Sequence, residues 1–248
     1  MNEQAKNLHN ELHKEFYLTC EKYFIFEFLT IAAGMMGLYT YNLRGGVFSN
    51  AQTGNIVKMA AAFGGLNFAE GFYYFIPFCA YILGTVVSEI LPEKVRRSHF
   101  IRWDTLLVGI EIFTLLLIGF MPFTWPDQIA QVAINFLCAM QFNTFRQAEG
   151  VPMATTFLTN HVRQIGISIA RVISHHEEEK KQAKKAVKHA RLILAFFVGG
   201  VVVTFMSKFL HEKTIWLAII PLSLCFCVML RADLIYERAM LDLKPHGH

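Results

Sequence analysis

The chain has 248 residues, of which 54% are hydrophobic and only 17% are charged, and its net charge is +4. The charged residues cluster between apolar runs about as long as the ~20 residues that a helix needs to cross a bilayer. A soluble domain would spread its charges over every surface helix, so this pattern excludes that class and indicates an integral membrane protein. The basic residues flank the apolar runs, which indicates membrane topology and not a nucleic-acid surface.

A polar segment at residues 1–23 begins the chain and shows no cleavage-site pattern of a signal peptide. The apolar runs that follow are at 24–42, 47–65, 68–91, 103–122, 128–147, 151–172, 189–210 and 214–231. None alternates with the period of a barrel strand, so all are predicted to be helices. They form a first membrane repeat at 24–122 and a second at 128–231, which contains a basic loop at 174–191, and a polar tail at 232–248 ends the chain.

Both repeats contain the same interrupted, polar pattern, 105 positions apart. The first copy covers residues 45–58 and the second covers residues 150–163. Each begins with glycine, carries asparagine at its eleventh position and ends in a basic residue. Polar groups inside a bilayer cost free energy, so they indicate function by default. Duplicated, interrupted apolar segments also point to the binding site of a transporter.

The positions of lysine and arginine separate two topologies. If runs 47–65 and 151–172 are broken or re-entrant, six crossings remain. Outside these two runs, every Lys and Arg except Arg44, Lys208 and Lys213 then lies on the cytoplasmic side. If all the runs cross, the basic residues divide more evenly between the two sides. The positive-inside bias therefore favours six crossings, with both termini in the cytoplasm of a bacterial inner membrane.

The predicted fold is an all-α integral membrane protein with six crossings, two broken or re-entrant helices, and two inverted repeats of three crossings each. The broken runs would enter from opposite faces, so their tips could meet near the midplane. Non-helical backbone at that depth is tolerated only where it is buried in protein or lines a watery cavity. Apolar residues at 56–63 and 165–173 could still continue each run as a helix, so eight full spans are the alternative.

Short motifs in both halves resemble a known family. They are GVF at 46–48, QTGNIV at 52–57, AMQFN at 139–143 and VPMATTFLT at 151–159. Together they resemble the signature of the YoaK family, bacterial membrane proteins of unassigned function. Asn160 departs from the pattern, because the family usually has glycine there. The resemblance covers nearly the whole chain and implies an inner-membrane protein with about six helices, but no substrate.

We predict a substrate site between the two tips. Lys58 and Arg163 lie one turn beyond each tip, where helix N-termini would help them to bind an anion. The alternative is that both snorkel to the headgroups or pair with acids. The titration range of His161 suits a pH gate, although a structural role is the alternative. The candidate substrate-binding residues are Gln52, Thr53, Asn55, Lys58, Gln141, Asn143, Thr159, Asn160, His161, Arg163 and Gln164. Glu27 and Glu111 are candidate buried acids that could relay protons or pair with Lys58 or Arg163.

No catalytic motif, phosphate loop or metal-ligand set is present in the sequence, and its five cysteines follow no zinc-type spacing. We therefore predict no enzymatic activity, metal or cofactor, and a membrane enzyme acting on lipid or quinone is a third possibility that no motif supports. The leading hypothesis is a small channel or transporter for a small polar or anionic solute. The alternative is a non-transporting membrane scaffold or partner-binding subunit, in which the polar tips lock helices together. The expected partners are the lipid bilayer and the solute, without nucleic acid, and a homo-oligomer is left open.

Overall fold

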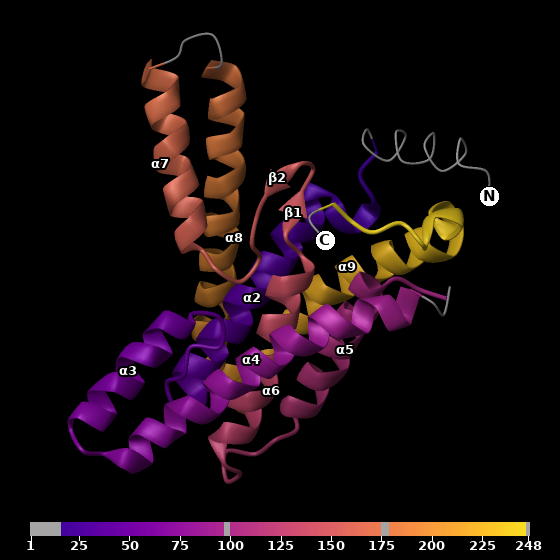
Figure 1. Cartoon of the computed structure of the whole chain (residues 1–248). Helices are drawn as coiled ribbons and strands as arrows, with labels where there is room; N and C mark the ends of the chain where they lie inside the picture. Colours follow the sequence, from indigo (N-terminus) through magenta and orange to yellow (C-terminus); the bar gives the residue numbers. More distant parts are fainter. Residues whose placement is uncertain (1–15, 97–99, 175–178, 247–248) are drawn as a thin grey trace.

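The computed structural model describes residues 16–96, 100–174 and 179–246. Within these ranges the chain is almost entirely helical, with one antiparallel pair of two-residue strands (Figure 1). Three helical stretches there are long and apolar enough to cross a bilayer, namely Tyr23–Leu43, Phe68–Arg96 and Lys180–Tyr236. The prediction of a helical membrane protein is confirmed at this level, and the short strands are the departure from an all-α chain.

The longer helices are α2 (Tyr23–Leu43), α3 (Gln52–Gly64), α4 (Phe68–Arg96), α5 (Trp103–Ile118), α6 (Asp127–Thr144), α7 (Thr159–Ser174), α8 (Glu179–Leu210) and α9 (Ile219–Arg231). The short elements are η1 (Thr19–Glu21), β1 (Gln147–Ala148), β2 (Val151–Pro152), η3 (His211–Ala218), η4 (Ala232–Tyr236) and η5 (Arg238–Met240). Helix α8 begins inside the charged stretch 174–191, of which residues 175–178 lie outside the described residues. Most of the 1–23 segment also lies outside them.

Helices α2 and α6 run antiparallel, as contacts at both of their ends show. At one end, the amide of Glu149, shortly after α6, donates to the carbonyl of Glu21, just before α2. At the other end, Gln131 near the start of α6 donates to the carbonyl of Arg44, just after α2. The first end is termed the terminal face, because His246 near the chain end also contacts Glu21 there. The second end is termed the far face.

Glycines allow the long helices to pack closely. Helix α2 packs against α8, and α4 packs against α6. A Cβ atom on Gly34 would clash with the carbonyl oxygen of Phe196, and one on Gly199 would clash with that of Ile31. Gly84 of α4 has the same role against the backbone of α6. Small residues at helix crossings are typical of membrane proteins, where backbone proximity supplies packing.

Runs 47–65 and 151–172 each divide into an irregular segment and a short helix. Helix α3 has 13 residues, which corresponds to about 20 Å and is too short to cross a bilayer. The matched glycines Gly45 and Gly150 have φ of +69° and +75°, a conformation that glycine adopts without steric cost. In Figure 1, α3 lies beside the first part of α4 and α7 lies beside the first part of α8, so two hairpins leave the bundle in different directions.

Candidate functional site

The first irregular segment turns from the far face into the middle of the bundle. Ser49 and Asn50 are buried there. Asn50 Nδ2 donates to the carbonyl oxygen of Ala33, halfway along α2, at 3.1 Å. Gln52 at the start of α3 donates through Nε2 to Oδ1 of Asn135 in α6 at 2.8 Å. Helix α3 therefore begins inside the bundle.

The second irregular segment reaches the same level from the terminal face. Gln141 of α6 donates through Nε2 to Thr155 Oγ1 at 2.9 Å and to the carbonyl oxygen of Leu29 in α2 at 3.3 Å. Leu29 and Ala33 are one turn apart, about 6 Å along the helix axis. The buried residues at this level are termed the central polar layer, and they are Ser49, Asn50, Asn135, Gln141, Thr155 and Thr156.

The central polar layer has unused hydrogen-bonding capacity. Gln141 Oε1 is buried without a hydrogen-bond partner among the described residues. Ser49 and Thr156 make only weak contacts, with the side chains of Cys138 and Tyr81. Each unpaired buried group costs about 1–3 kcal/mol, so several together indicate a site that something else completes. The amide oxygen accepts hydrogen bonds and the hydroxyls can accept or donate. The layer therefore offers hydrogen-bond acceptors to a group that carries N–H or O–H donors.

Asn55 fixes the conformation of the first break. It is 1% exposed, and its Oδ1 accepts from the amide of Phe48 at 2.9 Å. Its Nδ2 donates to the carbonyl oxygen of Phe48 at 2.6 Å and to Gln52 Oε1 at 3.0 Å. Thr53 is exposed. Of the predicted residues in this segment, Gln52 connects the break to α6, and Asn55 holds its backbone in place.

The matched cations Lys58 and Arg163 have different surroundings. Lys58 Nζ donates to the carbonyl oxygen of Gly46. The same ammonium lies 4.9–5.4 Å from three ring centroids, those of Tyr41, Phe48 and Tyr74. Such contacts contribute up to about 2 kcal/mol when the cation is desolvated. On α7, the exposed predicted residues are Thr159 and Arg163, and the half-buried ones are Asn160 and Gln164.

His161 fixes the conformation of the second break. Its Nε2 lies 2.8 Å from the carbonyl oxygen of Ala154, and its Nδ1 lies 2.8 Å from Nδ1 of His189 in α8. Both rings are buried. If neutral His161 donates from Nε2, it must accept at Nδ1, so His189 donates there and its Nε2 is left unpaired. Burial lowers the pKa of His161, although its hydrogen bond with Ala154 acts in the opposite direction.

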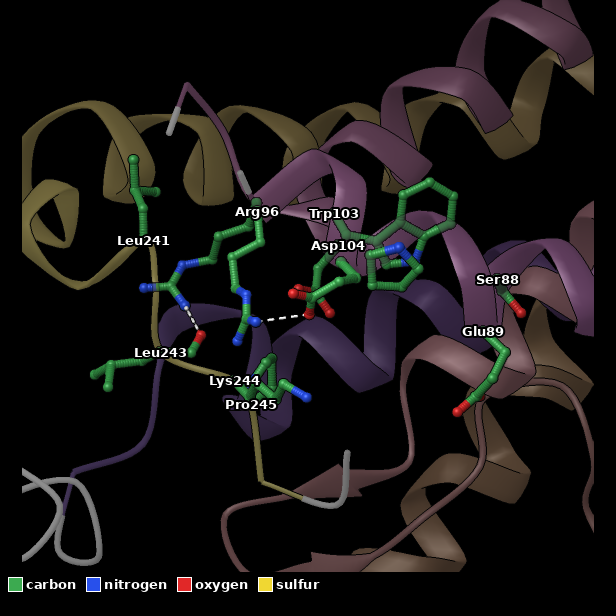
Figure 2. A pocket seen from close by; sticks show the side chains of 12 residues that line it. Ser88, Glu89, Arg96, Trp103, Asp104, Leu241, Leu243, Lys244 and Pro245 are labelled. Atoms are coloured by element: carbon green, nitrogen blue, oxygen red, sulfur yellow. Dashed lines mark hydrogen bonds and ion pairs between the residues drawn. The ribbon is translucent and has the colours of Figure 1, made fainter. Parts of the chain in front are cut away.

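Asn143 contacts a separate pocket on the terminal face. Its Nδ2 donates to Ser88 Oγ and Glu89 Oε2, each at 3.0 Å, and Arg146 pairs with the same carboxylate of Glu89 at 2.7 Å. Ser88 and Glu89 line a pocket of about 140 Å³, together with the end of α4, the start of α5 and the C-terminal residues 241 and 243–245 (Figure 2). Asn143 is thus placed away from the central polar layer.

Arg102 joins the C-terminal segment to the bundle at this pocket. It is 4% exposed, and its Nε donates to Asp233 at 3.1 Å. Its other nitrogens donate to the carbonyl oxygens of Met240 and Leu243. Figure 2 shows Leu243 on the opposite side of the pocket from Ser88 and Glu89. Acidic and basic residues both line the pocket, so it presents no field of a single sign to a charged ligand.

The two candidate acids have different surroundings. Glu27 is partly exposed and pairs with Arg191 at 2.7 Å. Glu111 is completely buried in α5, and neither of its carboxyl oxygens has a hydrogen-bond partner among the described residues. Its neighbours include Cys138 of α6 and Cys225 of α9. Glu27 is therefore a surface ion pair, whereas Glu111 is an isolated acid inside the bundle.

Comparison with known proteins assigns the family. The family model described as "Protein of unknown function (DUF1275)" matches residues 25–228. The chain belongs to the DUF1275 family. This DUF1275 chain is 22% identical over 209 residues to the UPF0700 transmembrane protein YoaK of Bacillus subtilis (strain 168), covering 83% of this chain and 92% of that protein. No solved structure matches it. The family resemblance carried by the motifs is confirmed, and the chain is a membrane protein.

Sequence reasoning missed several residues of the central polar layer. Ser49, Asn50, Thr155 and Thr156 belong to the two interrupted segments, and Asn135 interrupts an apolar run, but the pattern does not single them out. Their polarity within apolar runs was the available signal. Which of these side chains turn inward depends on the backbone of each break, which the spacing alone does not determine.

Proposed function

We propose that the chain is a carrier for a small, uncharged polar solute that binds at the central polar layer. The observation that carries this proposal is the meeting of two irregular segments at one level of α2, with unpaired polar atoms between buried helices. Irregular backbone inside a membrane protein is tolerated where it lines a site. Broken helices at equivalent positions of two repeats are characteristic of transporter binding sites.

An inverted repeat with six crossings accounts for the packing. Helices α2 to α5 match α6 to α9 in order, and the first of each set, α2 and α6, are antiparallel. Helix α2 packs against α8 as α6 packs against α4, and α3 and α7 each pack against the helix that follows. In this arrangement α3 and α7 do not cross. Both chain ends and the basic loop 174–191 would face the cytoplasm of a bacterial inner membrane.

Two features indicate which class of solute and which type of transport fit the central polar layer. Lys58 is held by aromatic rings and a backbone carbonyl, and Arg163 is exposed, so neither supports an anion at the layer. An uncharged molecule with several donors fits the unpaired acceptors better. Every residue of the layer is buried, which corresponds to an occluded state. A carrier that opens alternately to each face therefore fits better than an open channel.

Counterflow exchange in proteoliposomes tests this proposal, with radiolabelled urea, glycerol and xylitol as probes. We expect at least one probe to exchange faster than in empty liposomes. Gln141→Leu should slow that exchange about tenfold, because it removes a buried hydrogen-bonding group worth about 1.4 kcal/mol. The matched control is Arg163→Ala, which should leave exchange unchanged. If no probe exchanges through folded protein, or if Gln141→Leu exchanges as fast as the wild type, the proposal is wrong.

A non-transporting scaffold is the second candidate, because Asn55 and His161 act on the backbone of the breaks and not on the layer. In a scaffold these contacts would only lock the helices together. Thermal unfolding in detergent separates the two functions. A carrier should be stabilised by the probe that it exchanges, since a ligand that binds only the folded state raises its stability. A scaffold should show no shift with any of the three probes.

A further inference from the structure

Glu111 is an acid in a place where an ionised side chain would be very costly. It is the ninth of the 16 residues of α5, and it is 0% exposed. Both carboxyl oxygens lack a hydrogen-bond partner among the described residues. An unpaired carboxylate in such a site would cost several kcal/mol, so the side chain is held as the neutral acid. An apolar residue would fill the same space at lower cost, which indicates a function for the carboxyl group.

The surroundings of Glu111 place it close to the central polar layer without joining it. Cys138 of α6 has both Glu111 and Ser49 as neighbours. No described charged group lies near enough to stabilise or oppose ionisation of Glu111. In particular, Lys58 and Arg163 are not its partners. Water is therefore the available source of stabilisation for a carboxylate here, and it would have to enter through the layer.

We infer that Glu111 is the proton-binding group that couples solute movement to the proton gradient, an inference that rests on the proposed function. The proton lies on a carboxyl oxygen while the bundle is closed. When the layer opens to the side of low proton concentration, water hydrates the group and accepts the proton, which leaves a carboxylate. The carboxylate opposes closure because its burial is costly. The carrier therefore closes only after a proton returns to the carboxylate, or after a solute binds whose N–H or O–H donors stabilise the carboxylate, so one proton is exchanged for one solute molecule in each cycle.

Infrared spectroscopy tests the protonation without any transport assay. The closed wild-type protein should show the C=O stretching band of a protonated carboxylic acid at neutral pH. Glu111→Gln should remove that band, Glu111→Asp should keep a shifted one, and the matched control Glu27→Gln should leave it unchanged. A band that survives Glu111→Gln would overturn the inference, as would a wild-type spectrum without any such band.

Two transport measurements then distinguish proton coupling from solute exchange by the carrier, with urea, glycerol and xylitol again as the probes. A pH difference of about one unit should drive about tenfold accumulation of the exchanged probe if one proton is exchanged for each solute molecule. Glu111→Gln should lose this accumulation while counterflow exchange persists. Equal accumulation by Glu111→Gln and the wild type would overturn the coupling and leave the carrier intact. Absence of exchange in the wild type would reject the carrier itself.

Discussion

The two breaks in this chain have the same construction but use different chemistry. In the first, the side chain of Asn55 binds the amide and carbonyl of Phe48, seven residues earlier. In the second, the ring of His161 contacts the carbonyl of Ala154, again seven residues earlier. Each contact bends the chain back on itself before a short helix. The two breaks therefore share the geometry of this contact and differ in the residue type that makes it.

The residue that makes the contact also differs by one position between the two breaks. Asn55 aligns with Asn160, but the contact in the second break is made by His161, which aligns with Ile56. An amide holds the first break with a permanent donor and acceptor, whereas an imidazole can gain a proton. The first break is therefore expected to be insensitive to pH, and the second is expected to respond to acid.

The largest expected effect comes from removing the first of these contacts. Asn55→Ala should destabilise the protein by about 3 kcal/mol, because it removes the three hydrogen bonds that the buried Asn55 side chain makes with Phe48 and Gln52. The matched Asn160→Ala, at a half-buried position, should change stability by no more than about 0.5 kcal/mol. Unfolding of purified protein in detergent measures both. Equal losses at the two asparagines would mean that the breaks are built alike after all.

At the contact made by His161, the larger loss of stability should instead come from the position in the second break. His161→Ala removes the hydrogen bonds to Ala154 and His189 from a buried site, so it should cost about 2 kcal/mol. The matched Ile56→Ala, at a side chain that is 42% exposed, should cost less than about 1 kcal/mol. The same unfolding assay applies. A larger loss at Ile56 than at His161 would contradict the one-residue shift between the breaks.

Much of the architecture could be predicted from the sequence, because long apolar runs indicate helices that enter a bilayer. The run at 24–42 lies within one residue of the bounds of α2, and the interrupted runs contain irregular segments where glycine and polar residues occur. The sequence could not indicate that His161, and not Asn160, makes the contact that holds the second break. An ungapped alignment of the two segments assumes that matched positions have the same role. The partners of Lys58 were also hidden, since Tyr41 and Tyr74 come from neighbouring helices.

The matched cations give a third and smaller comparison. Lys58→Met should cost about 1 kcal/mol, because the aromatic rings and the carbonyl of Gly46 lose a partly desolvated ammonium. Arg163→Met should be nearly neutral, since that side chain is exposed. Detergent unfolding measures both variants, and raising the salt concentration should change the Lys58 effect little. A substantial cost at Arg163 with none at Lys58 would show that the second cation is the structural one.

The smallest effect concerns the residues just before the matched glycines. Arg44 is buried before Gly45, whereas Glu149 before Gly150 is partly exposed and pairs with Lys188 at 2.6 Å. Burial alone would raise the pKa of Glu149, but hydrogen bonds from Lys188 and from the amide of Tyr23, with the charge of Lys188, lower it overall. The stability that the Glu149 carboxylate contributes is therefore fully present above about pH 4.3, the ordinary pKa of glutamate. It is lost as pH falls through the lower pKa that this group has in the folded protein.

Glu149→Gln should consequently reduce stability by no more than about 0.5 kcal/mol at neutral pH, because the pair is exposed to solvent. The gap between variant and wild type should close in acid, where the wild-type carboxylate is also neutral. Denaturant unfolding at pH 7 and at about pH 3 measures the gap. A gap that stayed constant with pH would mean that shape at this turn matters and charge does not. The two breaks would then differ in fewer respects than their contacts suggest.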